Sequence, residues 1–316
     1  MAARVLVTGA SGMLGRAVMR QLRGAPAAQQ ITALGTARSR VGGELITLDM
    51  CDADALRRVV AEARPTAVIH CAAERRPDVS EGEQEYTTSL NAEASGHLAT
   101  LCAEAGAWMV YLSTDYVFDG QPGGAPYAID ATPNPLNHYG VSKLGGEEAV
   151  MAVPEAHACV MRVPVLYGLD CPTLAESASL VVAEVLKGGG PDAPKVQVDD
   201  WGARFPTLVD DVAACISRII ELKLAEPSAC TGPLHFSSPE ESTKYQQALL
   251  MAEVLGMSAE HLVPDPDAPP GAVRPKNTAL DCSATWELLG GMPQMMPLAE
   301  GFERALAPFA DELRRG

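Results

Sequence analysis

The sequence predicts an α/β protein in which a doubly wound parallel sheet precedes a smaller, mostly helical C-terminal region. Short apolar or β-branched runs alternate with helix-length amphipathic segments along the first half of the chain, and this alternation is typical of parallel sheets. A glycine-rich turn directly follows the first run, and proline and glycine become dense after about Gly168. Together these observations favour a Rossmann-type fold.

The strands and helices of this sheet follow one another in a regular order. The runs predicted as strands are residues 4–8, 31–34, 45–48, 67–71, 107–113 and 159–163. The segments predicted as helices are residues 13–23, 52–63, 90–105 and 139–153. Because the alternation continues past a minimal five-stranded unit, we expect six or seven strands joined by right-handed crossovers.

The second half of the chain is predicted as a region added to this core. Its helical patterns cover residues 174–187, 208–224, 243–255 and 298–313, and its short strands lie near residues 195–198 and 234–237. We therefore expect a Rossmann core over residues 1–168 and a C-terminal substrate or partner region over residues 169–316. Some of the later segments are expected to return to the core sheet.

Composition and charge exclude several classes of protein. Hydrophobic residues make up 47% of the 316 residues and charged residues 20%, so the chain can bury a core and is not intrinsically disordered. The net charge of −16 repels phosphate backbones and anionic bilayers, so neither nucleic acid nor a membrane is an expected partner. No stretch reaches the roughly 18 apolar residues of a membrane span, and the first strand starts too early for a signal peptide.

The eight cysteines favour a cytoplasmic protein with reduced thiols. No two of them form a C-x-x-C pair, and several, such as Cys159, lie in apolar runs. A zinc cage and a disulfide scaffold are therefore not expected, and no metal site is predicted.

A phosphate-binding turn is predicted where the first strand meets the first helix. Gly9, Gly12 and Gly15 form a glycine-x-x-glycine-x-x-glycine pattern there, and Ser11, Met13 and Leu14 lie between them. Glycines permit a tight turn and bring backbone N–H groups close to a pyrophosphate at the positive end of the helix. The alternative is a plain glycine-rich turn, but its place at the first strand–helix junction favours dinucleotide binding.

The end of the second strand indicates NADP as the cofactor. An acidic residue about 20 positions after the turn would bind the ribose 2′-hydroxyl of NAD, but the sequence there contains Ala37, Arg38 and Arg40. Guanidinium groups can bind the 2′-phosphate of NADP, and Arg38 is the better placed of the two. The alternative is that both arginines are solvated loop charges.

The ends of the next two strands supply further candidate cofactor contacts. Asp49 and Met50 follow the third strand, where a loop would flank the adenine. Small residues end the fourth strand, at the carboxyl edge where open α/β sheets bind ligands: Cys71, Ala72 and Ala73.

Tyr139 and Lys143 form a candidate catalytic pair at the start of a predicted helix. They are four residues apart and share a helix face, so the ammonium can lower the pKa of the phenol from about 10 toward working pH. Ser113 and Thr114 end the fifth strand and could hydrogen-bond a substrate carbonyl, which would complete a set for ketone reduction. The alternative is a surface helix with a packed tyrosine and a solvated lysine.

At these residues the chain resembles the extended short-chain dehydrogenase/reductase family. The glycine turn, the Tyr139–Lys143 pair and residues 162–168 fit that family as a whole. Residues 113–120 and 274–277 look like its dTDP-4-dehydrorhamnose reductase branch. Residues 70–79, 201–207 and 280–282 are similar to regulatory beta subunits of methionine adenosyltransferase, which belong to the same branch, and the run Glu74–Pro77 best separates those subunits from the reductases.

The resemblance implies an NADP-binding protein that forms a hetero-oligomer with the catalytic subunit of methionine adenosyltransferase. It also implies contacts of Arg75, Val163, Leu166, Tyr139 and Lys143 with the cofactor, in addition to the residues already named. Thr114, Tyr139 and Lys143 match the reductase chemistry, so the alternative is an NADPH-dependent reductase of a 4-keto nucleotide sugar. The sequence leaves open whether the protein is an enzyme.

Other polar residues have simpler interpretations. Arg75 and Arg76 suit an anionic ligand but could be solvated loop charges. His70 lies in an apolar strand and is expected to be a hydrogen-bonded core histidine. Three acidic residues are expected to form a solvated face: Glu81, Glu83 and Glu85.

Overall fold

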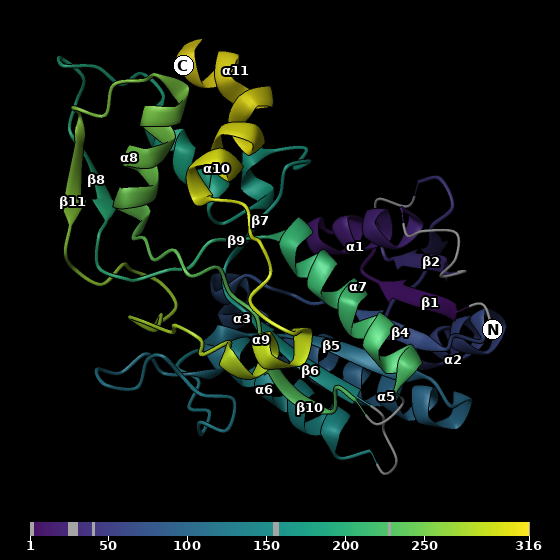
Figure 1. Cartoon of the computed structure of the whole chain (residues 1–316). Coiled ribbons are helices and arrows are strands. Elements are labelled where there is room, and N and C mark those ends of the chain that lie inside the picture. The colour runs from purple at the N-terminus through teal and green to yellow at the C-terminus, as the bar shows by residue number, and fades with distance from the viewer. Residues whose placement is uncertain (1–2, 25–30, 40–41, 154–157, 227–228, 316) are drawn as a thin grey trace.

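A seven-stranded sheet, parallel throughout, confirms the predicted fold class (Figure 1). The computed structural model describes residues 3–24, 31–39, 42–153, 158–226 and 229–315. In spatial order the strands are β10 (Gly232–His235), β6 (Ala158–Val163), β5 (Trp108–Thr114), β4 (Ala67–His70), β1 (Ala3–Thr8), β2 (Ile31–Ala37) and β3 (Ile46–Thr47).

The strand order reverses at β1, and this places the functional edge of the sheet. Val7 of β1 pairs with Gly35 of β2 on one side and with Ile69 of β4 on the other. The chain therefore adds strands on both sides of β1. The loops after β1 and β2 lead to one side of the sheet and the loop after β4 leads to the other, so they separate at the carboxyl end of β1. Such a switch point is where open α/β sheets bind ligands.

Helices cover both faces of the sheet because its central strands are apolar on both sides. One face carries α1 (Met13–Arg23) and α7 (Val209–Ala225), which pack on each other and on Val5, Val7 and Val110. The other face carries α2 (Ala53–Ala63), α5 (Ala94–Ala105) and α6 (His138–Met151). This face buries Leu6 and Tyr111, and burial of apolar area on both faces is the main term that stabilises such a sheet.

Several helices begin at side-chain caps. Asp52 accepts a hydrogen bond from the N–H of Ala55 at the start of α2, at 2.9 Å, and Asn137 accepts one from the N–H of Gly140 at the start of α6, also at 2.9 Å. These caps satisfy N–H groups that the helix itself leaves unpaired. The cap at Asn137 fixes the first turn of α6, which carries Tyr139.

The C-terminal region has a hydrophobic core of its own, in which Leu180, Met251, Phe302 and Leu306 are buried together. Its helices are η4 (Leu174–Glu176), η5 (Leu180–Leu186), α8 (Lys244–Leu255), α10 (Leu298–Leu306), η6 (Ala307–Phe309) and α11 (Ala310–Arg315). Two small parallel sheets complete it: β8 (Val196–Asp199) with β11 (Leu262–Asp265), and β7 (Leu166–Tyr167) with β9 (Thr207–Leu208).

Seven short elements had no counterpart in the sequence prediction: α3 (Pro77–Gly82), α4 (Gln84–Thr88), η3 (Asp115–Val117), α9 (Ser283–Leu289), β7, β9 and β11. The strand expected near residues 234–237 is β10 of the main sheet, and the one near 195–198 is β8. Two segments of the second half therefore join the Rossmann core: β10 is a strand of the main sheet, and α7 packs on the face that carries α1. The division at residue 168 stays a prediction.

Three predicted helices are wrong in part. Residues 174–187 form two 3₁₀ segments because the Ser177 hydroxyl donates to the Leu166 carbonyl at 2.9 Å and accepts from the N–H of Ser179 and of Leu180, both at 3.2 Å. Those bonds compete with α-helix formation. Residues 90–93 lie in a π-helical turn, η2 (Ser89–Glu93). The helix expected over 298–313 is interrupted at η6, where Pro308 lacks the N–H that an α-helix needs.

Candidate functional site

One cavity of about 540 Å³ lies at the carboxyl edge of the sheet, over the switch point. The ends of β1, β2, β4, β5 and β6 and the start of α6 line it. All predicted catalytic and cofactor-binding residues that the structure describes line this cavity: Gly9, Ser11, Gly12, Met13, Leu14, Gly15, Ala37, Arg38, Asp49, Met50, Cys71, Ala72, Ala73, Arg75, Thr114, Tyr139, Lys143, Val163 and Leu166. Arg40 lies outside the described residues.

The glycine turn is shaped by close backbone packing. Gly9 has a φ of +66°, and a Cβ added to it would lie 2.7 Å from the backbone nitrogen of Ala72. A Cβ on Gly15 would lie 2.2 Å from the carbonyl oxygen of Gly9. Any side chain at these positions would displace the turn, and the first-turn N–H groups of α1 face outward from it without intrahelical partners. The turn therefore fits the pyrophosphate of a dinucleotide.

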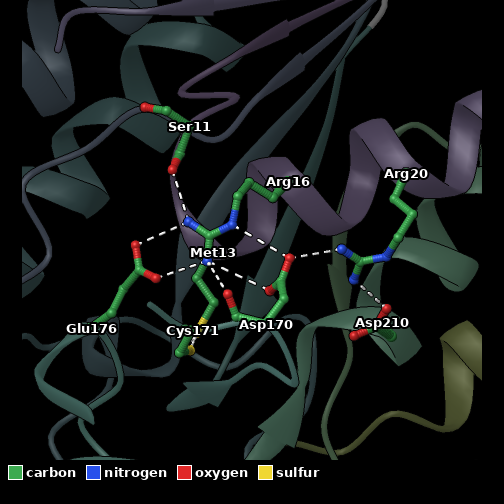
Figure 2. Close-up of polar contacts among 8 residues, drawn as sticks. All are labelled: Ser11, Met13, Arg16, Arg20, Asp170, Cys171, Glu176 and Asp210. Carbon is green, nitrogen blue, oxygen red and sulfur yellow. Dashed lines mark hydrogen bonds and ion pairs between the residues drawn. The ribbon is translucent and has the colours of Figure 1, made fainter. Parts of the chain in front are cut away.

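An arginine cluster joins this turn to the C-terminal region (Figure 2). Arg16 of α1 donates to the Ser11 carbonyl at 2.9 Å and to the two carboxylate oxygens of Glu176 at 3.1 and 2.7 Å. Asp170 lies between Arg16 and Arg20 and accepts from both. The hydrogen bonds that Arg16 donates to Glu176, and then those to Asp170, raise its pKa above the usual range against the cost of burial. The hydrogen bond from Arg16 to the Ser11 carbonyl therefore fixes the backbone of the turn.

Arg38 lines the cavity directly after the end of β2. Its Nε lies 3.1 Å from Asp49 Oδ2, and its guanidinium carbon lies 5.3 Å from the ring centre of Tyr86, whose hydroxyl accepts a hydrogen bond from Nη1. The side chain is 58% exposed, so one face of the guanidinium is open to a ligand. A cation held over an aromatic ring in this way is an appropriate partner for a phosphate.

Arg75 and Arg76 have different surroundings. Arg75 Nη2 donates to the Glu176 carbonyl at 2.8 Å, so this side chain crosses from the end of β4 to η4 beside the glycine turn. Arg76 pairs with Glu74, with contacts of 2.9 and 2.7 Å. Both arginines line the cavity, and the charge of Arg76 is already balanced by Glu74.

Thr114, Tyr139 and Lys143 converge on the same cavity from β5 and α6. Burial raises the pKa of Tyr139, and a hydrogen bond with Thr114 opposes this only in part. Burial lowers the pKa of Lys143 to about 7, against the attraction of Glu147. The expected lowering of the Tyr139 pKa by Lys143 is therefore wrong for this arrangement. The Lys143 ammonium lies 4.0 Å over the ring of Tyr111, and burial has the largest effect on the pKa of Tyr139.

A buried ion pair lies next to the candidate catalytic residues. Glu147 receives Arg162 Nη2 at 2.6 Å and the Ser113 hydroxyl at 2.5 Å, and both charged side chains are under 10% exposed. The pair links α6 to β5 and β6 one turn after Lys143. Breaking such a pair leaves a buried charge without compensation, so it holds this end of α6 in place.

His70 is a core histidine, as the sequence predicted. Its Nδ1 lies 2.6 Å from Thr8 Oγ1 and its Nε2 lies 3.0 Å from Ser95 Oγ. Burial lowers the pKa of the ring to about 3, so it is neutral and does not titrate near physiological pH. Burial also raises the pKa of the Cys71 thiol to about 12, which makes this cavity-lining cysteine unreactive.

Sequence reasoning did not assign some of the lining residues to the cavity. Several adjoin assigned positions, and the rule that strand ends line the site could have found them: Thr36, Ser39, Leu48, Glu74, Pro77, Leu112, Asp115, Tyr116, Pro164 and Val165. Tyr86, Leu90 and Ala178 come from segments that reach the cavity only through the tertiary fold. No signal in the sequence pointed to them.

Two kinds of feature are absent from the described residues. No three His, Cys, Asp or Glu side chains among them are grouped as a metal site. No helix in the described ranges is long and apolar enough to cross a membrane.

Comparison with known proteins gives a consistent family assignment. The family model described as the RmlD substrate binding domain matches residues 3–310. Methionine adenosyltransferase 2 subunit beta of Xenopus tropicalis is 40% identical over 312 residues, which cover 98% of this chain and 89% of that protein. A dTDP-4-dehydrorhamnose reductase of Streptomyces griseus is 35% identical over 293 residues, 92% of this chain and 89% of that protein.

A solved structure agrees with these sequence matches. The dTDP-4-dehydrorhamnose reductase of Bacillus anthracis, crystallised in complex with NADP, has a TM-score of 0.78 and 27% identity, and the match covers 98% of this chain and 99% of that one. The glycine turn, the Tyr139–Lys143 pair and the sheet order all lie within the matched region. The chain belongs to the RmlD substrate binding domain family, within the extended short-chain dehydrogenase/reductases.

Proposed function

We propose that this protein is an NADP-binding regulatory subunit that docks on the catalytic subunit of methionine adenosyltransferase in the cytoplasm. The observation that carries the proposal is the similarity to subunit beta proteins over 98% of the chain, at 38–40% identity. That similarity includes the Glu74–Pro77 run, which lines the cavity. The function follows from relatedness, and the geometry of the cavity supports the cofactor.

NADP is the proposed cofactor because Arg38 and Ser39 stand at the end of β2, where an NAD-binding protein carries an acid. The glycine turn would hold the pyrophosphate, and Arg38 and Arg75 would meet phosphate charge at either end of the cavity. Asp49 already pairs with Arg38, so it stabilises the arginine rather than a ribose hydroxyl.

The alternative proposal is an NADPH-dependent reductase of a 4-keto nucleotide sugar. It is favoured by the presence of Thr114, Tyr139 and Lys143 around one cavity. Bound NADPH would supply a hydride in that reaction. Burial keeps the Tyr139 phenol protonated at neutral pH, so its O–H can donate a proton to a carbonyl oxygen that Thr114 helps to orient.

Co-purification with the methionine adenosyltransferase catalytic subunit from the same cell, with and without NADP, tests the main proposal. We expect a complex at micromolar concentration, and its affinity should fall as salt rises if the acidic surface steers a basic partner. The apolar side chains of α10 and η6 do not offer a docking contact, because Leu298, Phe302 and Leu306 are buried in the core of the C-terminal region and Phe309 packs against that core. If the two proteins stay separate at low salt in both conditions, the regulatory proposal fails.

A spectrophotometric assay separates the alternative. Oxidation of NADPH by a 4-keto nucleotide sugar, abolished in Tyr139→Phe, would establish the reductase. The control is Tyr245→Phe on α8, because that tyrosine does not line the cavity.

A further inference from the structure

The side chain of Tyr86 reaches the cavity from α4, one of the two short α-helices between β4 and α5. Its ring centre lies 5.3 Å from the guanidinium carbon of Arg38, and its hydroxyl accepts a hydrogen bond from Arg38 Nη1. The ring and the hydroxyl therefore hold the same guanidinium, although the two residues are 48 positions apart in the chain.

Asp49 holds this guanidinium from a different element, the loop after β3. Its Oδ2 lies 3.1 Å from Arg38 Nε. The contacts of Tyr86 and Asp49 thus go through Nη1 and Nε, and the two N–H groups of Nη2 take no part in them. Because the Arg38 side chain is 58% exposed, the guanidinium is fixed and still offers donors to a ligand in the cavity.

The helix that carries Tyr86 is itself fixed against the start of α6. The Nε2 atom of His138 lies 3.0 Å from the Gln84 carbonyl oxygen and 3.1 Å from Thr88 Oγ1. Both ends of α4 are therefore held at one residue of α6, and the side chain of Thr87 between them is fully buried. Tyr86 has a set position before any ligand binds.

Tyr86 holds Arg38 without neutralising it. Burial has the largest effect on the phenol and raises its pKa above the usual value, so the oxygen that accepts from Arg38 is uncharged at neutral pH. Arg76 differs, because the carboxylate of Glu74 holds its guanidinium, with contacts of 2.9 and 2.7 Å. A second carboxylate in place of Tyr86 would lower the positive potential at Arg38 and its attraction for a phosphate.

We propose that Tyr86 is a specificity-determining residue for the cofactor, because it positions the Arg38 guanidinium for the 2′-phosphate that NADP carries and NAD lacks. A free arginine side chain loses conformational entropy when it binds a phosphate, and one already held by a ring and a hydroxyl loses less. Tyr86 acts through Arg38, so its effect is confined to the dinucleotide with the phosphate. The inference rests on the proposed NADP cofactor.

The test is equilibrium fluorescence titration of the full-length protein with NADPH and with NADH. Tyr86→Leu should weaken NADPH binding by about 3- to 10-fold, the range of a cation–π contact with a neutral hydrogen bond, and should change NADH binding by less than about 2-fold. Tyr86→Phe keeps the ring and its packing, so its loss should be smaller and again confined to NADPH. The matched control is Tyr245→Leu, the same change at a partly buried tyrosine that does not line the cavity.

A double-mutant cycle measures whether Tyr86 acts through Arg38. In the Arg38→Ala background, the further change Tyr86→Leu should leave NADPH binding unchanged, because the guanidinium that the tyrosine positions is gone. Additive losses would mean that Tyr86 meets the ligand independently, and they would overturn the inference.

Two further results would also overturn it. Equal weakening of NADPH and NADH by Tyr86→Leu and by Tyr86→Phe would mean that the tyrosine only shapes the cavity wall. Wild-type NADPH affinity in Tyr86→Leu would mean that Arg38 is held without it. A wild type that prefers NADH would remove the proposed cofactor together with the inference, whereas docking to the catalytic subunit is measured separately by the co-purification.

Discussion

Both carboxylate oxygens of Glu176 accept hydrogen bonds from the guanidinium of Arg16, at 2.7 and 3.1 Å, and so link α1 to η4, the first helical turn of the C-terminal region. The pair is partly buried, with side-chain exposures of 9% for Glu176 and 24% for Arg16. The next arginine along the helix, Arg20, is more exposed and pairs with Asp170 and Asp210.

These two arginines make a matched pair of variants. Arg16→Gln should lower the free energy of unfolding by about 1–2 kcal/mol, because it removes charge-assisted bonds to Glu176 and to the Ser11 carbonyl. Arg20→Gln should cost about 0.5 kcal/mol, as expected for an exposed pair. Urea denaturation followed by circular dichroism measures both, and equal losses would contradict the special role of Arg16.

Arg38 is predicted to set the cofactor preference. Arg38→Ala should weaken NADPH binding by about 1.5–3 kcal/mol, the range of a charge-assisted phosphate contact, and should leave NADH binding almost unchanged. Equilibrium fluorescence titration measures both affinities. The control is Arg57→Ala, an exposed arginine of α2 paired with Glu104. Equal or tighter binding of NADH by the wild type would refute the prediction.

The glycine turn is predicted to tolerate no side chain at its third glycine. Gly15→Ala places a methyl group 2.2 Å from the Gly9 carbonyl oxygen, so the turn must shift and dinucleotide binding should fall by at least about 10-fold, with a stability loss of about 1–3 kcal/mol. Gly42→Ala is the control, because nothing lies within 4 Å of its added Cβ. Retention of wild-type NADPH affinity in Gly15→Ala would show that the turn does not hold the pyrophosphate.

Lys143 is predicted to make stability rise with pH. Its pKa is about 7 in the folded protein, against 10.5 in the unfolded chain. Between about pH 7 and pH 10.5 the unfolded state therefore binds more protons than the folded state. The free-energy cost of burying the charged lysine is lost as the pH rises through this range. Lys143→Met should therefore stabilise the protein most at pH 6, by a few kcal/mol on the order of the shift, and least at pH 10. Melting temperatures of both proteins across this range measure the effect. A difference that is constant with pH would contradict it.

Much of the sheet could be predicted because its signals are local. The β1 run and the glycines after it specify a strand, a turn and a helix within about 20 residues, and Tyr139 and Lys143 share a helix face by their spacing alone. The strand-end rule then gathered residues from five strands into one cavity, because parallel strands all end at the same edge.

The residues that were missed depend on contacts that no local pattern contains. Tyr86 reaches Arg38 from the short helix α4, and Ala178 reaches the cavity from the link between η4 and η5. The α-helix predicted over residues 174–187 is wrong although the apolar periodicity is present. The reason is that the Ser177 hydroxyl bonds backbone groups that an α-helix would pair internally. The electrostatics at Tyr139 were also out of reach, since burial and not sequence neighbours sets its pKa.

The order of strands in the sheet has a consequence for how the chain is made. β10 pairs with β6, yet it comes after η4, η5, β8 and all of α7 in the sequence. During synthesis, β6 is therefore an unpaired edge strand until β10, which ends at His235, has left the ribosome. The face of the sheet that α1 and α7 share is covered only by α1 until α7 has been made. An open edge of this kind can pair with other nascent chains. Chaperone protection should accordingly be needed until translation has passed this strand, and a shortened product of the first half would be prone to aggregate.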